Sequence, residues 1–420
     1  MLTQIRKKAI SFYYSVVGSI ALYPTIISLI LFMLSIYLVN TDYIAVAEWL
    51  KDNATFLAIA NAEAARTVLA TIIGGVISLT VFSFSMVMLT LNQASTNFSH
   101  RILPGLVSER NNQIVLGFYL GTAVYSLVVL LSIRSGDERS TELMLSVLIS
   151  MILFISCLAL FIYFINHIST NIQIDKIMND LFVETSSDLN KLSEEDKKVE
   201  QEIDIKKVSI VNSLESKFYH GVVRDEILKI CEKENINLHI IPYMGQFVLE
   251  GQPLFYFDQA EDEDLVNEIR DRIILSNSNI NEDSYRSGFN LLTEIGVKAM
   301  SPGINDPATA VATIDYLSSL YLQRLKISDY SLIYTSDKRN VLRTSRQSFD
   351  ELLRNSLSQY RLYCKENVSL MHKLKNLLEA LSGGLIFDNS YETSIENQLK
   401  AIKHDIKKFI TNPIDLEEIG

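Results

Sequence analysis

Small and hydroxyl-bearing side chains recur along one apolar segment of the chain. Thr71, Ser78 and Ser85 are seven residues apart, which is nearly two helical turns, so a helix would align them in one stripe. The full stripe is Thr71, Gly74, Gly75, Ser78, Phe82, Ser85 and Asn92. Such residues let membrane helices approach closely and hydrogen-bond across their interface. A ring of such helices would instead present the hydroxyls to a water-filled path, with Phe82 as a constriction. Both interpretations stay open.

A second packing pattern lies in a later apolar segment. Gly117 and Gly121 are four residues apart, so a helix would place both on the same face. Small residues at this spacing allow the backbone of a neighbouring membrane helix to come close. We therefore expect these two glycines to lie at a helix-helix contact.

One polar turn is expected to separate two helices of the C-terminal half. The turn consists of Ser301, Pro302, Gly303, Asn305, Asp306 and Pro307. A helix over about residues 284–299 is stopped by Pro302 and Gly303, and the next helix begins with Asp306 as N-cap and Pro307 at its first position. An anion could bind at the new helix N-terminus. Capping nevertheless accounts for every residue of the turn.

The sequence contains no catalytic or metal-binding signature. It lacks a glycine-rich phosphate loop with its lysine, a nucleophile elbow, a His-Glu-x-x-His helix and paired cysteines. Its six histidines are scattered, and its three cysteines, Cys157, Cys231 and Cys364, suit neither a zinc site nor a disulfide framework. We therefore expect no catalytic residue, no metal, no cofactor and no enzyme activity.

Four long apolar runs are the elements that position the stripe and the glycine pair. They cover residues 17–39, 68–91, 114–133 and 143–164, and none contains Asp, Glu, Lys or Arg. Each run has the roughly 20 residues that a helix needs to cross a bilayer. Proton-coupled transporters need ionisable groups within their spans. The sequence therefore favours passive flux, or no flux, over pumping, and the lipid bilayer is the expected environment.

Positive charge predicts the orientation of these spans. Arg6, Lys7 and Lys8 precede the first span, and Arg101 and Arg110 lie between the second and the third. By the positive-inside rule both regions are cytoplasmic, and an even number of spans places the C-terminal part on the same side. We expect a multi-pass protein of the cytoplasmic (inner) membrane with both termini in the cytoplasm.

The remainder of the chain is acidic and of mixed secondary structure. The net charge of -11 is concentrated after Asp175, so this part has no basic face for nucleic acid. Strands are expected at residues 209–214, 237–241, 246–249, 253–257, 331–335 and 341–344, and helices at 224–234, 348–366, 369–381 and 394–409. Residues 245–254 resemble the hairpin of biotinyl and lipoyl domains, without the lysine that those domains modify.

These elements predict a mainly α membrane protein: four transmembrane helices followed by a cytoplasmic α+β domain with a small β region and a C-terminal helical subdomain. The expected divisions are a transmembrane domain over residues 1–170, a helical extension and charged linker over 171–207, a small β-rich region over 208–260 and a mainly helical cytoplasmic domain over 261–420.

Several of these segments resemble one known family. They are Phe82 to Val87, Gln93 to Ser95, Phe98 to Arg101, Asn112 to Gly117 with Tyr125 and Ser126, and Ser301 to Pro307. In combination they resemble the bacterial family of predicted membrane proteins labelled domain of unknown function 2254, over nearly the whole chain. His100 stands where that family often has proline, and Asn166 precedes His167 where a histidine pair is common. The resemblance implies an integral protein of the bacterial cytoplasmic membrane and no particular activity.

Three classes of function follow. The first is a homo-oligomeric, channel-like protein for passive ion or small-solute flux, in which the second span lines the path and the cytoplasmic domain assembles or gates it. The alternative is a membrane-anchored scaffold or sensor whose cytoplasmic domain binds a protein or a small ligand. An enzyme, the third class, would require a cytoplasmic cleft with converging polar groups.

Overall fold

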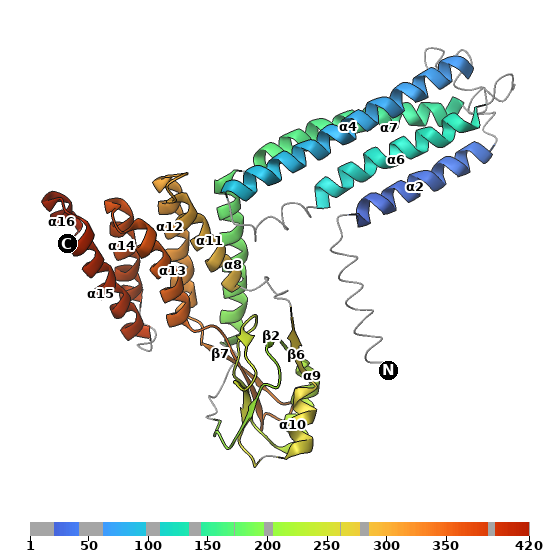
Figure 1. The fold of residues 1–420 in the computed structure, drawn as a ribbon. Helices are drawn as coiled ribbons and strands as arrows, with labels where there is room; N and C mark the ends of the chain where they lie inside the picture. The colour runs from blue at the N-terminus through green and yellow to red at the C-terminus, as the bar shows by residue number, and fades with distance from the viewer. Residues whose placement is uncertain are drawn as a thin grey trace. The chain divides into compact units, whose positions relative to one another are not determined.

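The chain divides into two compact units, Met1–Lys176 and Ile177–Gly420. The structure, a computed structural model, describes residues 21–41, 62–97, 110–133, 144–171, 173–196, 205–260, 262–277, 285–384 and 391–419. Figure 1 shows the course of the chain through both units. The mainly helical fold class is confirmed, with four candidate membrane helices followed by a region that contains strands.

In the described residues of the first unit, the four expected apolar runs form four helices. They are α2 (Leu22–Asn40), α4 (Ala62–Asn97), α6 (Arg110–Ser132) and α7 (Met144–Asn171). Each is long and apolar enough to cross a membrane. Arg6, Lys7, Lys8 and Arg101, on which the predicted orientation depends, lie outside the described residues, so the placement of the termini stays a prediction.

Helix α6 is the central helix of this unit, because it packs against α2, α4 and α7. Its buried positions recur at helical spacing and include Val115, Tyr119 and Tyr125. Tyr125 and Val129 pack with residues of α2, α4 and α7 in one apolar cluster, and Tyr119 belongs to a second cluster with α4 and α7.

Most of α8 (Ile174–Asp196) belongs to the second unit, and this helix begins three residues after α7 ends at Asn171. It lies within residues 171–207, for which the sequence predicts a helical extension and a charged linker. Its buried residues are Ile177, Met178, Thr185 and Leu189. Thr185 lies against Gly288, and Phe182 packs on Tyr316 with ring centroids 5.1 Å apart. Helix α8 is thus part of the fold of the second unit.

Among the described residues of this unit, eight strands form two sheets. The five-stranded sheet has the order β1-β5-β3-β8-β7, and the three-stranded sheet has the order β4-β2-β6. The strands are β1 (Ser209–Asn212), β2 (Lys217–Val222), β3 (Leu238–Ile240), β4 (Phe247–Val248), β5 (Pro253–Phe257), β6 (Ile273–Ser276), β7 (Tyr330–Tyr334) and β8 (Val341–Ser345). All pairs are antiparallel except β3 with β8. Helices α9 (Arg224–Glu234) and α10 (Glu263–Arg270) pack on the same core.

The strands expected at residues 331–335 and 341–344 are present as β7 and β8, and they belong to the same sheet as β1, β3 and β5. One expectation about the strands is wrong. Strands β4 and β5 do not form a hairpin, since β4 pairs with β2 whereas β5 lies between β1 and β3. The physical reason is burial: Leu254, Phe255 and Phe257 are almost fully buried, as in a strand covered on both faces, whereas Phe247 of β4 is exposed.

The remaining helices form a layered helical part. They are α11 (Tyr285–Ala299), α12 (Pro307–Arg324), α13 (Phe349–Cys364), α14 (Val368–Gly384), α15 (Glu392–Phe409) and α16 (Pro413–Ile419). Helix α11 packs on α12 and α13, and α14 packs on α12 and α15. The fully buried Arg324, at the end of α12, donates to the backbone oxygens of Ile327 and Gln347 and to Asp329 Oδ1. This arginine ties the helices to β7 and β8.

Candidate functional site

The hydroxyl groups of the α4 stripe lie on an exposed face of the chain. Thr71, Ser78 and Ser85 each donate a hydrogen bond of 2.8 to 2.9 Å to the backbone oxygen four residues earlier. Because these hydroxyls are satisfied within α4, they can face lipid without leaving a polar group unpaired. The same side chains remain available to a neighbouring helix.

The other members of the stripe divide between two environments. Gly75 and Phe82 lie toward α7: a Cβ atom at Gly75 would be 3.1 Å from the Phe154 ring, and the Phe82 ring meets Phe161 edge-on at 5.6 Å. Gly74 has open space around the position of a Cβ atom, and Asn92 is exposed. The uncovered part of the stripe is therefore Thr71, Gly74, Ser78 and Ser85, which we call the α4 outer stripe.

Gly117 and Gly121 lie where α6 meets α2. A Cβ atom at Gly117 would be 2.8 Å from the Pro24 Cα atom, and one at Gly121 would be 2.6 Å from Leu31 Cδ1. Both distances are too short for a real Cβ contact. The two glycines thus permit the close approach of these helices, and the nearest neighbours of their Cβ positions belong to α2, not to the α4 outer stripe.

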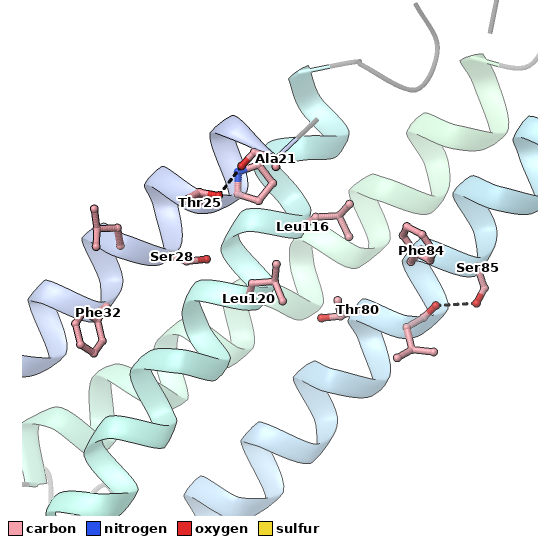
Figure 2. A pocket seen from close by; sticks show the side chains of 12 residues that line it. Ala21, Thr25, Ser28, Phe32, Thr80, Phe84, Ser85, Leu116 and Leu120 are labelled. Atoms are coloured by element: carbon pink, nitrogen blue, oxygen red, sulfur yellow. Dashed lines mark hydrogen bonds between the residues drawn. The ribbon is translucent and has the colours of Figure 1, made fainter. Parts of the chain in front are cut away.

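An apolar groove of about 1020 Å³ lies between α2 and α4, with α6 between them (Figure 2). Leu29 and Phe32 of α2, Val81 and Phe84 of α4, and Leu116 and Leu120 of α6 provide its apolar lining. The hydroxyls of Thr25, Thr80 and Ser85 at its wall donate to their own helix backbone. The groove therefore suits an apolar occupant and contains no reactive group.

The turn from Ser301 to Pro307 performs local capping. Asp306 accepts hydrogen bonds from the Thr309 N–H at 3.2 Å and the Thr309 hydroxyl at 2.6 Å, and these bonds hold the pKa of Asp306 below its usual value. Pro307 is the first residue of α12, and Asn305 has a left-handed φ of 49°. Ser301 O accepts from the N–H groups of Ile304 and Asn305. Pro302 and Gly303 complete this turn, in which the backbone N–H groups of residues 304–306 and the Asp306 carboxylate are paired locally.

A polar cleft in the second unit was not predicted from the sequence. Its volume is about 390 Å³, and its walls come from five parts of the chain. Helix α8 contributes Asp188, Lys191, Leu192 and Glu195, the loop after β3 adds Tyr243 and Met244, and the start of α11 adds Tyr285 and Arg286. Strand β7 adds Ser331, and the end of β8 with the two residues after it adds Thr344, Ser345, Arg346 and Gln347. No local motif could reveal this site, because its residues span positions 188 to 347.

Arg346 is the most constrained charge in the cleft wall. Its side chain is 8% exposed, and its Nη1 donates to Asp196 Oδ2 at 2.8 Å and to Ser328 O at 3.1 Å. Within the described part of the chain, Nη2 of Arg346 and Oε1 of Gln347 are buried without a hydrogen-bond partner. A buried polar atom without a partner is destabilising by about 1–3 kcal/mol. The cleft wall therefore holds one unused donor and one unused acceptor.

Arg286 and Tyr243 form a second polar group in the cleft. The guanidinium carbon of Arg286 lies 5.2 Å from the centre of the Tyr243 ring, within the range of a cation-π contact. The Tyr243 hydroxyl donates to Glu351 Oε1 at 3.1 Å, and burial raises the pKa of Tyr243 to about 12. Tyr243 is consequently neutral at physiological pH and presents its ring to the cation.

Behind the cleft, His239 is held between two hydroxyl groups. Its Nδ1 lies 2.7 Å from the Tyr256 hydroxyl and its Nε2 lies 2.9 Å from Ser345 Oγ. Ser345 Oγ donates to Ile240 O at 3.1 Å, so Nε2 carries the proton and Nδ1 accepts from Tyr256. Burial, followed by the charges of Arg343 and Lys207, lowers the pKa of His239 to about 4. This histidine is neutral and fixed in one tautomer.

Metal-binding residues do not cluster in the part of the chain that the structure describes: no group of three or more His, Cys, Asp or Glu side chains is placed to hold an ion. Cys157, Cys231 and Cys364 are buried and free.

Comparison with known proteins decides the family. Residues 18–380 match the model of the predicted membrane protein family DUF2254. The chain belongs to this family. It is 24% identical over 270 residues to "Uncharacterized protein Rv1290c" of Mycobacterium tuberculosis and to "Uncharacterized protein Mb1321c" of Mycobacterium bovis, a match that covers 61% of this chain and 51% of each relative. The chain thus spans about half the length of the curated relatives it matches.

No solved structure matches the chain. Membership of DUF2254, together with the four apolar helices, indicates a membrane protein and confirms the family resemblance predicted from the sequence. The family description adds no activity.

Proposed function

We propose that this DUF2254 protein is a membrane-anchored sensor, in which a small ligand binds the polar cleft and changes the position or mobility of α8. The observation that supports this proposal is the place of α8. The helix contributes Asp188, Lys191, Leu192 and Glu195 to the cleft wall, and it begins three residues after the last candidate membrane helix. A ligand in the cleft would therefore touch the helix that leads directly to α7.

Binding can act on α8 only if the ligand prefers one of its arrangements. The cleft offers such a preference, because Asp196 at the end of α8 accepts hydrogen bonds from Arg346 and from the Ser328 N–H. A ligand that engages Arg346 would alter the electrostatic surroundings of this contact. Arg346 thus lines the binding site and also holds the end of α8 through Asp196.

We infer a binding function rather than catalysis from the same geometry. Ser345 and His239 are the only serine-histidine pair at the cleft among the described residues, at 2.9 Å. The Ser345 hydroxyl donates to a backbone oxygen, and the pKa of about 4 makes His239 a poor general base at neutral pH. This pair lacks an activated nucleophile.

The test is a thermal-unfolding screen of the full chain against a small-molecule library, with hydrogen exchange of α8 as the second measurement. Compounds that bind the cleft should stabilise the wild type and slow amide exchange over residues 188–195. Ser331→Trp, which fills the cleft, should abolish both effects. Ser358→Trp on the exposed face of α13 is the matched control. If no compound stabilises the wild type and fails to stabilise Ser331→Trp, the sensor proposal is wrong.

A second candidate function is a channel-like homo-oligomer for passive flux, with the second unit assembling or gating the path. The α4 outer stripe favours it, because these small and hydroxyl-bearing residues are not covered by any other helix of the described chain. The same face also exposes Val81, Phe84 and Leu89, which suit lipid or a packed partner helix. This candidate requires that copies of the chain meet along the stripe.

A further inference from the structure

We propose that the ligand of the cleft is a small organic anion, whose carboxylate or phosphate group is bound by Arg346 and Arg286. This inference rests on the proposed function, since it names the chemical class of the ligand for the same site. It is carried by the buried and partly unsatisfied guanidinium of Arg346, by the second guanidinium of Arg286, and by the start of α11.

The hydrogen-bonding state of Arg346 is the first argument. Arginine remains protonated in proteins, so this group is a buried cation. One nitrogen, Nη1, is used by Asp196 and Ser328, while Nη2 is buried and has no acceptor among the described residues. A guanidinium binds carboxylate and phosphate oxygens through several N–H groups at once. An anionic oxygen in the cleft would supply the acceptor that Nη2 lacks once a small movement of the Arg346 side chain exposes this buried atom.

The start of α11 provides the second argument. Tyr285 and Arg286, the first two residues of this 15-residue helix, line the cleft. Free backbone N–H groups and the helix dipole make such a terminus favourable for negative charge. Arg286 adds a full positive charge, and its stacking on Tyr243 restricts where the guanidinium can move. Arg286, Arg346 and the start of α11 thus border the same cavity, which a third cation, Lys191 of α8, also lines.

The acidic residues of the cleft lie on a single wall. Asp188 and Glu195 both belong to α8, and Asp188 is paired with Lys191 at 3.0 Å. The positive charges of Arg286 and Arg346 come from α11 and the end of β8. A ligand is therefore expected to bind with its anionic group toward α11 and β8.

The cleft also restricts the rest of the ligand. A volume of about 390 Å³ is near the lower limit of small-molecule sites. Tyr243, Met244 and Tyr285 offer apolar surface for a compact body. Gln347 Oε1 is a buried acceptor without a partner, so a ligand that also carries a hydroxyl or N–H donor would gain a hydrogen bond if this side chain turned toward the cleft.

The test uses the purified full chain with phenyl phosphate, benzoate and the neutral benzyl alcohol as probes, at constant ionic strength set with chloride. Affinity is taken from the concentration dependence of thermal stabilisation. The variants are Arg286→Gln and Arg346→Gln, with Arg354→Gln as the control, because Arg354 is an exposed arginine of α13. Arg346→Gln also breaks the pair with Asp196, so Arg286→Gln serves as the variant that leaves this pair intact.

We expect at least one anion to stabilise the wild type and Arg354→Gln, with affinity lower by about tenfold or more in the two cleft variants. A response to phenyl phosphate alone identifies a phosphate ligand, and a response to benzoate alone identifies a carboxylate.

Equal stabilisation of all four proteins, or no stabilisation by either anion, would overturn the anion assignment. In that case the library screen still tests the proposed function. Neutral compounds that stabilise the wild type but not Ser331→Trp would support the sensor proposal and would show only that its ligand is not an anion.

Discussion

At the scale of single residues, His239, which lies behind the cleft, makes the stability of the fold depend on pH. Its neutral form is favoured by burial and by the positive charges of Arg343 and Lys207, which together lower the pKa of His239 to about 4. The folded-state pKa of about 4 lies below the unfolded value of 6.5, so the unfolded chain binds the proton more readily between these values. The contribution of His239 to stability is therefore complete above about pH 6.5 and is lost as the pH falls toward about 4.

The prediction is that the unfolding temperature of the wild type decreases more steeply than that of His239→Gln as the pH falls from 6.5 to 4. Thermal unfolding at a series of pH values measures the difference, and carboxylates that titrate in this range contribute equally to both proteins. A constant difference between the two proteins across this range would show that His239 is not the responsible group.

The glycines of α6 give a graded prediction. Gly117→Ala forces a methyl group against the Pro24 backbone, which cannot move as a side chain can, so we expect a loss of about 1–3 kcal/mol. Gly121→Ala should cost less, because its nearest neighbour is the end of the Leu31 side chain. Gly74→Ala, in open space, is the control. Unfolding in detergent micelles ranks the three variants, and equal effects at Gly74 and Gly117 would contradict the packing.

At the scale of elements, the exposed face of α4 predicts contact between copies. In a chain whose three buried cysteines are replaced by alanine, Gly74→Cys and Ser78→Cys should form disulfide-linked dimers in the membrane. Leu131→Cys, at a residue of α6 that is 74% exposed, should not. Mild oxidation followed by non-reducing electrophoresis measures the products. Efficient cross-linking at all three positions would indicate random collision and remove the support for the channel-like candidate.

If the cross-links are specific, bilayer recordings test the path itself. A bulky or charged residue at Ser78 should change conductance if this helix lines an aqueous path. Cross-linking without conductance would leave the stripe as an ordinary packing surface between anchored copies.

The elements that local chemistry determines were predictable from the sequence. Uninterrupted apolar runs gave the four long helices, and Asp306 with Pro307 gave the start of α12, because a cap and a fixed φ act within a few residues. The cleft was not predictable, since Arg346 becomes a buried cation only after α8, β8 and the Ser328 region meet. The pairing of β3 with β8 was not predictable either, because these strands meet only in the folded chain and are far apart in the sequence.

At the scale of the whole molecule, the second unit has a core of its own. The apolar cluster around Phe255, Ile269 and Leu342 and the helices from α11 onward involve only residues after Ile177. We therefore predict that a fragment of residues 174–420 folds alone and unfolds cooperatively, as measured by circular dichroism. A fragment of residues 197–420 should melt at a lower temperature, because it lacks Met178, Leu189 and the Asp196 contact with Arg346. Identical melting of the two fragments would mean that α8 does not stabilise this unit.

The parallel pairing of β3 with β8 also joins two strands that are translated at different times. Asn237, just before β3, bonds to Val341 at the start of β8, 104 residues further along the chain. At roughly 5–20 residues per second, the ribosome takes about 5–20 s to produce this interval. During that time the nascent protein has its candidate membrane helices complete, while one edge of β3 still lacks its partner strand and is open to wrong pairing. The last strand of the sheet to be translated, β8, is thus the one that covers the open edge of β3.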